Sequence, residues 1–201
     1  IQLLRLAEPL TLTDDVQPVC LHDGQQALDA ADEGVVSGFG DINDPEYKIV
    51  QDNPDPKELR AATVAVYNNR ICQFRIRRFA ENYEVQVSSD YTYKSELGNV
   101  TILPSQICAG TYHRGTAPGD SGGPLVSQGV DGRWYEVGLT SWGEYGPKAW
   151  VHQDGTPCVF TRISSYCGWI EEKTGGAVKC GAPTEANVTA AAEPTESAPI
   201  E

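Results

Sequence analysis

The sequence predicts an all-β protein with antiparallel strands and a short C-terminal helix. Six short runs rich in β-branched and aromatic residues recur along the chain, separated by loops rich in Gly, Pro, Asp and Asn. This alternation is typical of a β-barrel or a β-sandwich. Few segments carry helix signals, and no apolar run reaches the roughly 18 residues that a membrane-spanning helix needs.

The predicted strands follow one another along the chain as Gly34–Phe39, Ala62–Tyr67, Tyr83–Val87, Pro124–Ser127, Trp134–Thr140 and Cys158–Ile163. A short helix is expected to begin near Asn68, because an asparagine is a good N-cap residue. A second helix is predicted over Ser164–Lys173. Ser164 or Ser165 is its expected cap, and it is expected to end near Gly175 and Gly176.

Composition divides the chain into a folded part, residues 1–180, and a tail, residues 181–201. The tail is rich in Ala, Pro, Thr, Glu and Ser. It has too little apolar surface to offset the entropy of ordering, so we expect a disordered tail or linker. The formal net charge of −13 argues against nucleic acid as a partner.

Two charged segments each allow two interpretations. The acidic segment Asp41–Glu58 is either a solvated loop or a surface that repels acidic substrates. The segment around Cys72 is basic, and it is either a solvated turn or a binding surface for an acidic partner or glycan. Its arginines are Arg70, Arg75, Arg77 and Arg78.

The most informative motif is Gly-Asp-Ser-Gly-Gly-Pro-Leu-Val at residues 119–126. A reactive serine needs its hydroxyl presented on a sharp turn, with backbone N–H groups free to point to where an oxyanion forms. Gly119 and Gly122 let the chain approach that point without a Cβ in the way. Ser121 is therefore the candidate nucleophile.

This octapeptide resembles the nucleophile loop of the chymotrypsin/trypsin family of serine endopeptidases. Other segments resemble that family in the same order along residues 1–173. They are the opening Ile-Gln-Leu-Leu-Arg-Leu, Ser37-Gly38-Phe39-Gly40, Cys108-Ala109-Gly110, Ser141-Trp142-Gly143 and Pro157-Cys158-Val159-Phe160-Thr161-Arg162.

The resemblance implies a chymotrypsin-like fold of two six-stranded antiparallel barrels. Residues 1–180 would be the C-terminal part of this catalytic domain: they would hold the second barrel and one orphaned strand of the first, formed by Ile1, Leu3, Leu4 and Leu6. The family's catalytic aspartate directly precedes the residue that is Ile1 here, and its histidine lies farther upstream. We therefore expect a fragment of the catalytic domain that is inactive alone. The chain's own histidines match no catalytic position and are expected in surface loops; they are His22, His113 and His152.

The resemblance also assigns roles around Ser121, which would attack the scissile bond of a protein or peptide substrate. The backbone N–H groups of Gly119 and Ser121 would form the oxyanion hole. Asp120 would pair with the N-terminal ammonium released when a zymogen is cleaved. No cofactor and no metal ion are expected.

The substrate-binding residues implied by the resemblance are Gly115, Thr116, Ser141, Trp142, Gly143 and Cys158. Gly115 stands at the base of the specificity pocket, where trypsin-like relatives carry an aspartate. Without that carboxylate, nothing offsets the desolvation of a substrate lysine or arginine. We therefore favour an apolar side chain at the substrate position before the cleaved bond (P1), although Asp154 in the following loop could reach a cationic one.

Six cysteines indicate an oxidising compartment and a secreted protein. The family pattern implies a disulfide between Cys72 and Cys108, and a bridge from Cys20 to an upstream propeptide, light chain or barrel. It gives no pairing for Cys158, Cys167 and Cys180. Acceptor patterns for N-glycosylation occur at Asn99 and Asn187.

Three functions remain open from the sequence. The favoured one is a secreted, trypsin-like serine protease made as a zymogen, of which this chain is the C-terminal part. The alternative is a catalytically inactive protease homologue that binds or regulates. A β-domain that shares only local motifs is the third, and the number of motifs in order argues against it.

Overall fold

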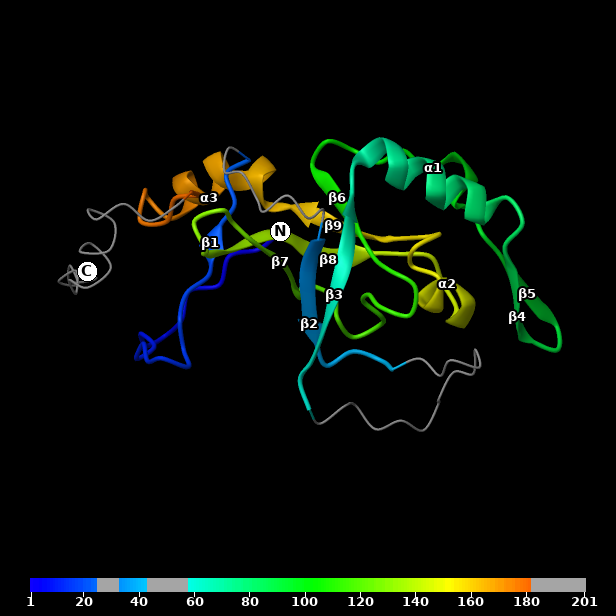
Figure 1. Cartoon of the computed structure of the whole chain (residues 1–201), viewed down its shortest axis with the longest axis horizontal. Coiled ribbons are helices and arrows are strands. Elements are labelled where there is room, and N and C mark those ends of the chain that lie inside the picture. Colours follow the sequence, from blue (N-terminus) through cyan, green and yellow to red (C-terminus); the bar gives the residue numbers. More distant parts are fainter. Residues whose placement is uncertain (25–32, 43–57, 182–201) are drawn as a thin grey trace, which may run out of the picture.

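The computed structural model describes residues 1–24, 33–42 and 58–181. Within these residues, six antiparallel strands close into a barrel (Figure 1). Their order around the barrel is β8-β7-β2-β3-β6-β9, and the pairing of β8 with β9 completes the circle. The strands are β2 (Glu33–Gly38), β3 (Arg60–Tyr67), β6 (Gln106–Ala109), β7 (Pro124–Gln128), β8 (Trp134–Trp142) and β9 (Cys158–Arg162). The predicted all-β fold with an antiparallel barrel is confirmed.

The main hydrophobic core fills the barrel. Because alternate residues of each strand point inward, every strand contributes side chains to one interior. Leu125 and Phe160 are almost fully buried there. The buried residues of this core are Val36, Val64, Ile107, Ala109, Leu125, Tyr135, Val137, Cys158 and Phe160.

Smaller elements surround the barrel. Strand β1 (Cys20–Leu21) runs parallel to β8, and β4 (Glu84–Ser88) pairs with β5 (Tyr91–Lys94) in a separate hairpin. The remaining short elements are η1 (Leu97–Asn99), α2 (Pro147–Val151), η2 (Ile163–Tyr166) and α3 (Cys167–Lys173). The sequence did not predict β5, β6 or α2, since four or five residues are too few for a clear periodicity.

Helix α1 (Asn69–Ala80) is longer than the short helix that the sequence predicted. Asn68 is its N-cap as expected, and its side-chain oxygen accepts a hydrogen bond from the Ile71 N–H at 2.9 Å. Cys72, Ile76 and Ala80 are spaced four residues apart and form its buried face.

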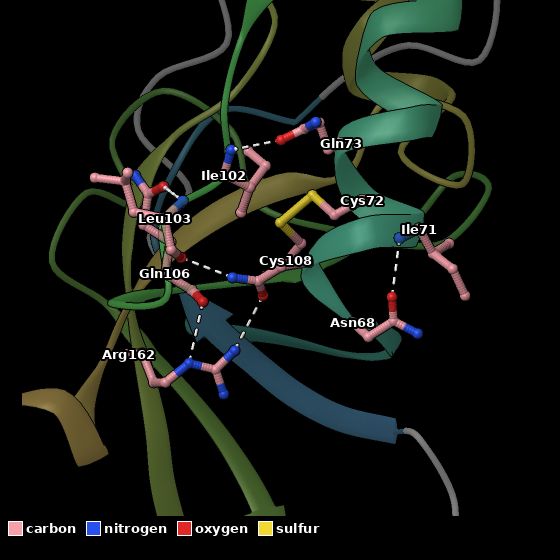
Figure 2. The surroundings of a disulfide bond; sticks show 10 residues. Asn68, Ile71, Cys72, Gln73, Ile102, Leu103, Gln106, Cys108 and Arg162 are labelled. Carbon is pink, nitrogen blue, oxygen red and sulfur yellow. Dashed lines mark hydrogen bonds between the residues drawn. A yellow bond between two sulfur atoms is a disulfide. The ribbon is translucent and has the colours of Figure 1, made fainter.

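The predicted disulfide between Cys72 and Cys108 joins α1 to β6 (Figure 2). A second small core surrounds it, with Ile76, Ile102 and Val159. A second bridge, which the sequence left open, joins Cys167 to Cys180. Cys20 and Cys158 form no disulfide in the part of the chain that the structure describes.

Residues 1–6 form no strand in the described structure, so the strand that the family resemblance implies for a first barrel stays a prediction. Their apolar side chains are exposed, and Leu4 has 81% of its surface in contact with solvent. A strand needs a neighbour that shares its backbone hydrogen bonds, and no described strand lies beside this segment.

The predicted cap of the C-terminal helix is wrong. Ser164 and Ser165 lie inside η2, and α3 begins after Tyr166 without any side-chain cap. The 3₁₀ turn continues directly into the helix, so no serine occupies the N-cap position. The end of the helix agrees with the prediction, because Gly175 and Gly176 adopt positive φ angles just beyond Lys173.

The two disulfides differ in the loop that each closes, with 36 residues separating Cys72 from Cys108 and 13 separating Cys167 from Cys180. Because a longer loop restricts the unfolded chain more, replacing Cys72 and Cys108 by alanine should cost about 4 kcal/mol of unfolding free energy. Replacing Cys167 and Cys180 should cost about 3 kcal/mol. Urea denaturation followed by tryptophan fluorescence measures both, with Cys20→Ala as the unbridged control. A larger loss from the shorter loop would contradict the expected order.

Candidate active site

The candidate nucleophile, Ser121, lies exposed on the loop that leads into β7. Backbone hydrogen bonds fix this loop against β8: the Gly122 N–H donates to the Thr140 carbonyl, and the Thr140 N–H donates to the Gly123 carbonyl, both at 2.9 Å. Gly119 and Gly122 have φ angles of 96° and 80°. Other residues rarely adopt such angles, so the two glycines are required by the turn.

The N–H groups of Gly119 and Ser121 have no hydrogen-bond acceptor among the described residues. Their neighbours in the loop do: the N–H of Asp120 donates to Ala117, and that of Gly123 donates to Asp120. The loop therefore leaves unpaired the two donors that the sequence assigned to the oxyanion hole. Unpaired, preorganised N–H groups beside a serine hydroxyl suit the stabilisation of a tetrahedral oxyanion.

A pocket of about 180 Å³ adjoins Ser121. It lies between the nucleophile loop, the end of β8 and the start of β9. Predicted site residues from all three segments line it, namely Thr116, Ser121, Ser141, Trp142, Gly143 and Cys158. The structure therefore brings these predicted residues together around one pocket and leaves Gly115 outside it, and their roles in binding stay predictions.

Gly115 does not line the pocket beside Ser121; it faces the buried side chain of Gln153. A Cβ on Gly115 would lie 1.7 Å from Gln153 Oε1. The Gln153 amide donates to the carbonyls of Thr116 at 2.7 Å and Trp150 at 3.2 Å, while its buried Oε1 accepts no hydrogen bond. A neutral amide thus fills the space that a side chain at position 115 would need.

Cys158 is buried in the pocket wall opposite Gly143. Its thiol donates a weak hydrogen bond to the Thr116 carbonyl at 3.6 Å, and burial raises its pKa. A Cβ on Gly143 would lie 2.8 Å from the sulfur atom. The thiol is therefore a neutral, bulky wall that narrows the pocket at this point.

Asp120 lines a second pocket, of about 310 Å³, behind the nucleophile loop. Its carboxylate accepts the Gly40 N–H at 2.8 Å and the Ala117 N–H at 2.9 Å. A Cβ on Gly38 or Gly40 would lie 2.1 or 2.5 Å from that carboxyl group, which explains both glycines of the Ser-Gly-Phe-Gly motif. Within the described ranges, no lysine, arginine or terminal ammonium forms an ion pair with Asp120.

No histidine lines the pocket that contains Ser121, so the described residues place no general base there. The ring of His22 lies beside that of Tyr135, and the rings of His113 and His152 both lie beside that of Tyr112. Asp154, which the sequence offered as a possible contact for a cationic substrate, lines a shallow hollow beside α1 instead.

Two residues of the site escaped the sequence analysis. Gln153 fills the space beside Gly115, and the buried Glu144 lines the wall beyond Gly143. Neither belongs to a motif. Both lie in the segment between β8 and β9, whose path is set by tertiary contacts and could not be deduced from local sequence.

The part of the chain that the structure describes contains no helix long and apolar enough to cross a membrane. Nor does it contain a group of three or more His, Cys, Asp or Glu side chains that could hold a metal ion. The site described above consists of a serine, backbone donors and a pocket whose wall includes the carboxyl group of Glu144.

Comparison with known proteins agrees with this geometry. The family model described as Trypsin matches residues 1–170. The chain is 31% identical over 175 residues to Serine protease 7 of Drosophila melanogaster, covering 86% of this chain and 37% of that protein. It is 33% identical over 173 residues to human Serine protease 41, covering 85% of this chain and 46% of that protein.

A solved structure with the same fold is neuropsin, a serine protease expressed in the limbic system of mouse brain. It superposes with a TM-score of 0.57 at 28% identity, covering 85% of this chain and 59% of the neuropsin chain. The chain spans about a third to a half of the length of the curated relatives it matches. With the barrel, the serine loop and the family match together, this chain belongs to the trypsin family of serine proteases.

Proposed function

We propose that this chain is the C-terminal part of the catalytic domain of a serine endopeptidase, with Ser121 as the nucleophile. The observation that carries the proposal is the exposed Ser121 beside a pocket, with the unpaired N–H groups of Gly119 and Ser121 next to it. In this reaction, the Ser121 hydroxyl attacks the scissile carbonyl, and the two N–H groups stabilise the oxyanion. Losing one such donor typically costs about 3 kcal/mol of transition-state stabilisation.

The proton of Ser121 needs an acceptor that the described residues do not place at the site. We propose that a histidine and an aspartate of an upstream barrel supply the base and its orienting partner, so that the chain alone is inactive. The exposed apolar side chains spread along residues 1–19 support this, because many exposed apolar side chains in one segment mark a surface that a partner covers. Cys20, half-buried and unbridged, is available for a disulfide to the upstream part.

Asp120 is proposed to respond to activation. Its half-buried carboxylate adjoins a pocket large enough for a terminal residue and has hydrogen-bond donors but no cation. A new N-terminal ammonium released by zymogen cleavage would supply that cation. Because Asp120 lies between the two oxyanion-hole donors in the chain, its position controls where both N–H groups point.

The pocket favours an apolar P1 side chain. Cys158 presents a neutral thiol to it, and Gly115, where trypsin-like relatives carry a carboxylate, lies outside it beside the Gln153 amide. Glu144 in the wall already accepts three hydrogen bonds from protein donors. A substrate lysine or arginine would therefore lose its hydration without gaining an ion pair at the base of the pocket.

Secretion and N-glycosylation remain part of the proposal. The two disulfides suit an oxidising compartment, and Asn99 is exposed at the end of η1. Asn187 and most of the acidic segment Asp41–Glu58 lie outside the described residues.

The nucleophile is tested with a fluorophosphonate probe on the full-length, activated protein. We expect Ser121 to be labelled, and Ser121→Ala to abolish labelling and lower kcat by about a millionfold, because no other group replaces the hydroxyl. The exposed Ser165 gives a matched control, since Ser165→Ala should label normally. The isolated chain should react far more slowly than the full-length protein. A folded, activated protein that is not labelled would instead support an inactive homologue that binds or regulates.

The role of Asp120 predicts a strong effect of Asp120→Asn on the activated protein. The amide would replace one acceptor oxygen by a donor facing a backbone N–H, and would remove the charge that pairs with the ammonium. We expect kcat to fall about 100-fold, in line with the loss of one oxyanion-hole donor. Asp90→Asn, at an exposed turn, should change nothing. Steady-state kinetics measure both, and equal kcat values for Asp120→Asn and the wild type would remove Asp120 from the mechanism.

The pocket beside Ser121 predicts the substrate profile. Peptides with Phe, Leu or Val at P1 should be cleaved with kcat/KM at least about tenfold higher than peptides with Lys or Arg, because burying an unpaired cation is costly. A library of fluorogenic peptides that differ only at P1 measures this. A preference for Lys or Arg would show that a carboxylate reaches the substrate, contrary to the proposal.

A further inference from the structure

Residues 143–146 are defined here as the outer wall of the pocket beside Ser121. The β4–β5 hairpin contacts this outer wall from outside the pocket. In Figure 1 this hairpin extends from the C-terminal end of α1 and lies next to the segment that carries α2. The hairpin belongs to the stretch between Cys72 and Cys108, and none of its residues lines the pocket. Any effect of the hairpin on the site therefore passes through the outer wall.

Glu144 is the centre of this contact, and only 4% of its surface is exposed. Its Oε1 accepts hydrogen bonds from the Tyr93 hydroxyl at 2.9 Å and from the Tyr145 N–H at 3.0 Å. Its Oε2 accepts one from the Ser95 hydroxyl. Two of the three donors thus come from the hairpin or the residues that directly follow it.

Tyr83 and Tyr93 add further contacts with the residues that follow Glu144. The Tyr83 hydroxyl donates to the Tyr145 carbonyl at 2.9 Å, and the Tyr93 ring lies edge-on to the Tyr145 ring with centroids 5.5 Å apart. Gly146 approaches so closely that a Cβ would lie 2.5 Å from the Tyr83 hydroxyl oxygen, and its φ angle is 105°. The hairpin therefore contacts Glu144 and Tyr145 through Tyr93, and Tyr83, which directly precedes the hairpin, contacts Tyr145.

The hydroxyl donors remain protonated under ordinary conditions. Burial, with smaller contributions from neighbouring acidic groups, raises the pKa of Tyr83 to about 12. Burial and the hydrogen bond to Glu144 raise the pKa of Tyr93 further above its usual value. Both phenols can therefore donate to the outer wall throughout the neutral pH range.

The burial of the Glu144 carboxyl group makes these donors necessary. No lysine or arginine pairs with Glu144 in the described parts of the chain. A buried carboxylate that loses its donors is strongly destabilised, so the outer wall keeps this conformation only while the hairpin supplies them. The hairpin and the outer wall are therefore coupled through one side chain.

We propose that Glu144 is a positioning residue through which the β4–β5 hairpin fixes the outer wall of the substrate pocket. The proposal rests on the protease function proposed above, because it assigns the outer wall to substrate binding. Since Glu144 and the hairpin do not touch Ser121, their loss weakens substrate binding more than it slows the chemical step. The expected signature is a change in KM at nearly constant kcat.

The test compares Glu144→Ala with Glu144→Gln in the full-length, activated protein. The alanine variant removes all the acceptors, and we expect KM for a peptide substrate to rise about tenfold while kcat changes less than about threefold. The glutamine variant keeps Oε1 for Tyr93 and Tyr145 and can donate to Ser95. It should restore KM to within about threefold of the wild type. An alanine variant with unchanged KM, or a glutamine variant as impaired as alanine, would overturn the proposal.

A second pair of variants separates coupling from general loss of stability. Tyr93→Phe removes one hairpin donor without touching the pocket, so it should raise KM in wild-type protein but have no further effect in the Glu144→Ala background. Glu84→Gln is the control, because Glu84 lies on the same hairpin in an exposed ion pair with Lys94 at 3.4 Å. Additive effects of Tyr93→Phe and Glu144→Ala would contradict a shared contact.

Amide hydrogen exchange tests the contact without any enzymatic activity. Glu144→Ala should increase exchange in both the hairpin, residues 84–94, and the segment 143–151, while Glu84→Gln should not. If the wild-type protein is not labelled by the fluorophosphonate but Glu144→Ala still increases exchange in both segments, the protease function is wrong and the structural coupling stands. Unchanged exchange in a protein that labels normally would reject the positioning role alone.

Discussion

The pairing of β8 with β9 closes the barrel, and the substrate pocket depends on this closure. The two strands diverge after Trp142, and the segment between them carries Glu144, α2 and Gln153 before returning at Cys158. Both ends of that segment are fixed by the barrel, so its residues face the nucleophile loop in a defined position. The loop itself is attached to β8 through the reciprocal hydrogen bonds of Thr140 with Gly122 and Gly123. The positions of Ser121, the oxyanion-hole donors and the pocket wall therefore all depend on β8.

Two carboxylates near this pocket are stabilised in the same way. Asp120 accepts backbone N–H groups from Gly40 and Ala117, and Glu144 accepts two hydroxyl groups and one N–H. Neither has a cationic partner among the described residues. Hydrogen bonds to a charged acceptor are strong, and their loss leaves a partly or fully buried charge unsatisfied. The conformation of the segments on either side of the site is therefore sensitive to small rearrangements of these donors.

Gly115 lies outside the pocket beside Ser121, and its small size has a specific structural reason. A glycine at position 115 is compatible with the buried Gln153 side chain, whereas any larger residue would overlap it. The Gln153 amide is oriented by the carbonyls of Thr116 and Trp150, which fixes its nitrogen and leaves its oxygen without a donor. Position 115 and position 153 must therefore change together if the charge of this region is to change.

The sequence alone determined the features that depend on neighbouring residues or on a strong motif. The Asn68 cap, most strands and the glycines around Ser121 follow from local backbone requirements, and the ordered family motifs identified the barrel and the Cys72–Cys108 bridge. Tertiary structure decided what depends on contacts between distant segments. Gln153 reaches Thr116 across 37 residues, and Tyr93 reaches Glu144 across 51, so no local pattern records either contact. The exposed segment at residues 1–6 shows the same limit, because apolar composition specifies a strand only where a neighbouring strand shares its hydrogen bonds.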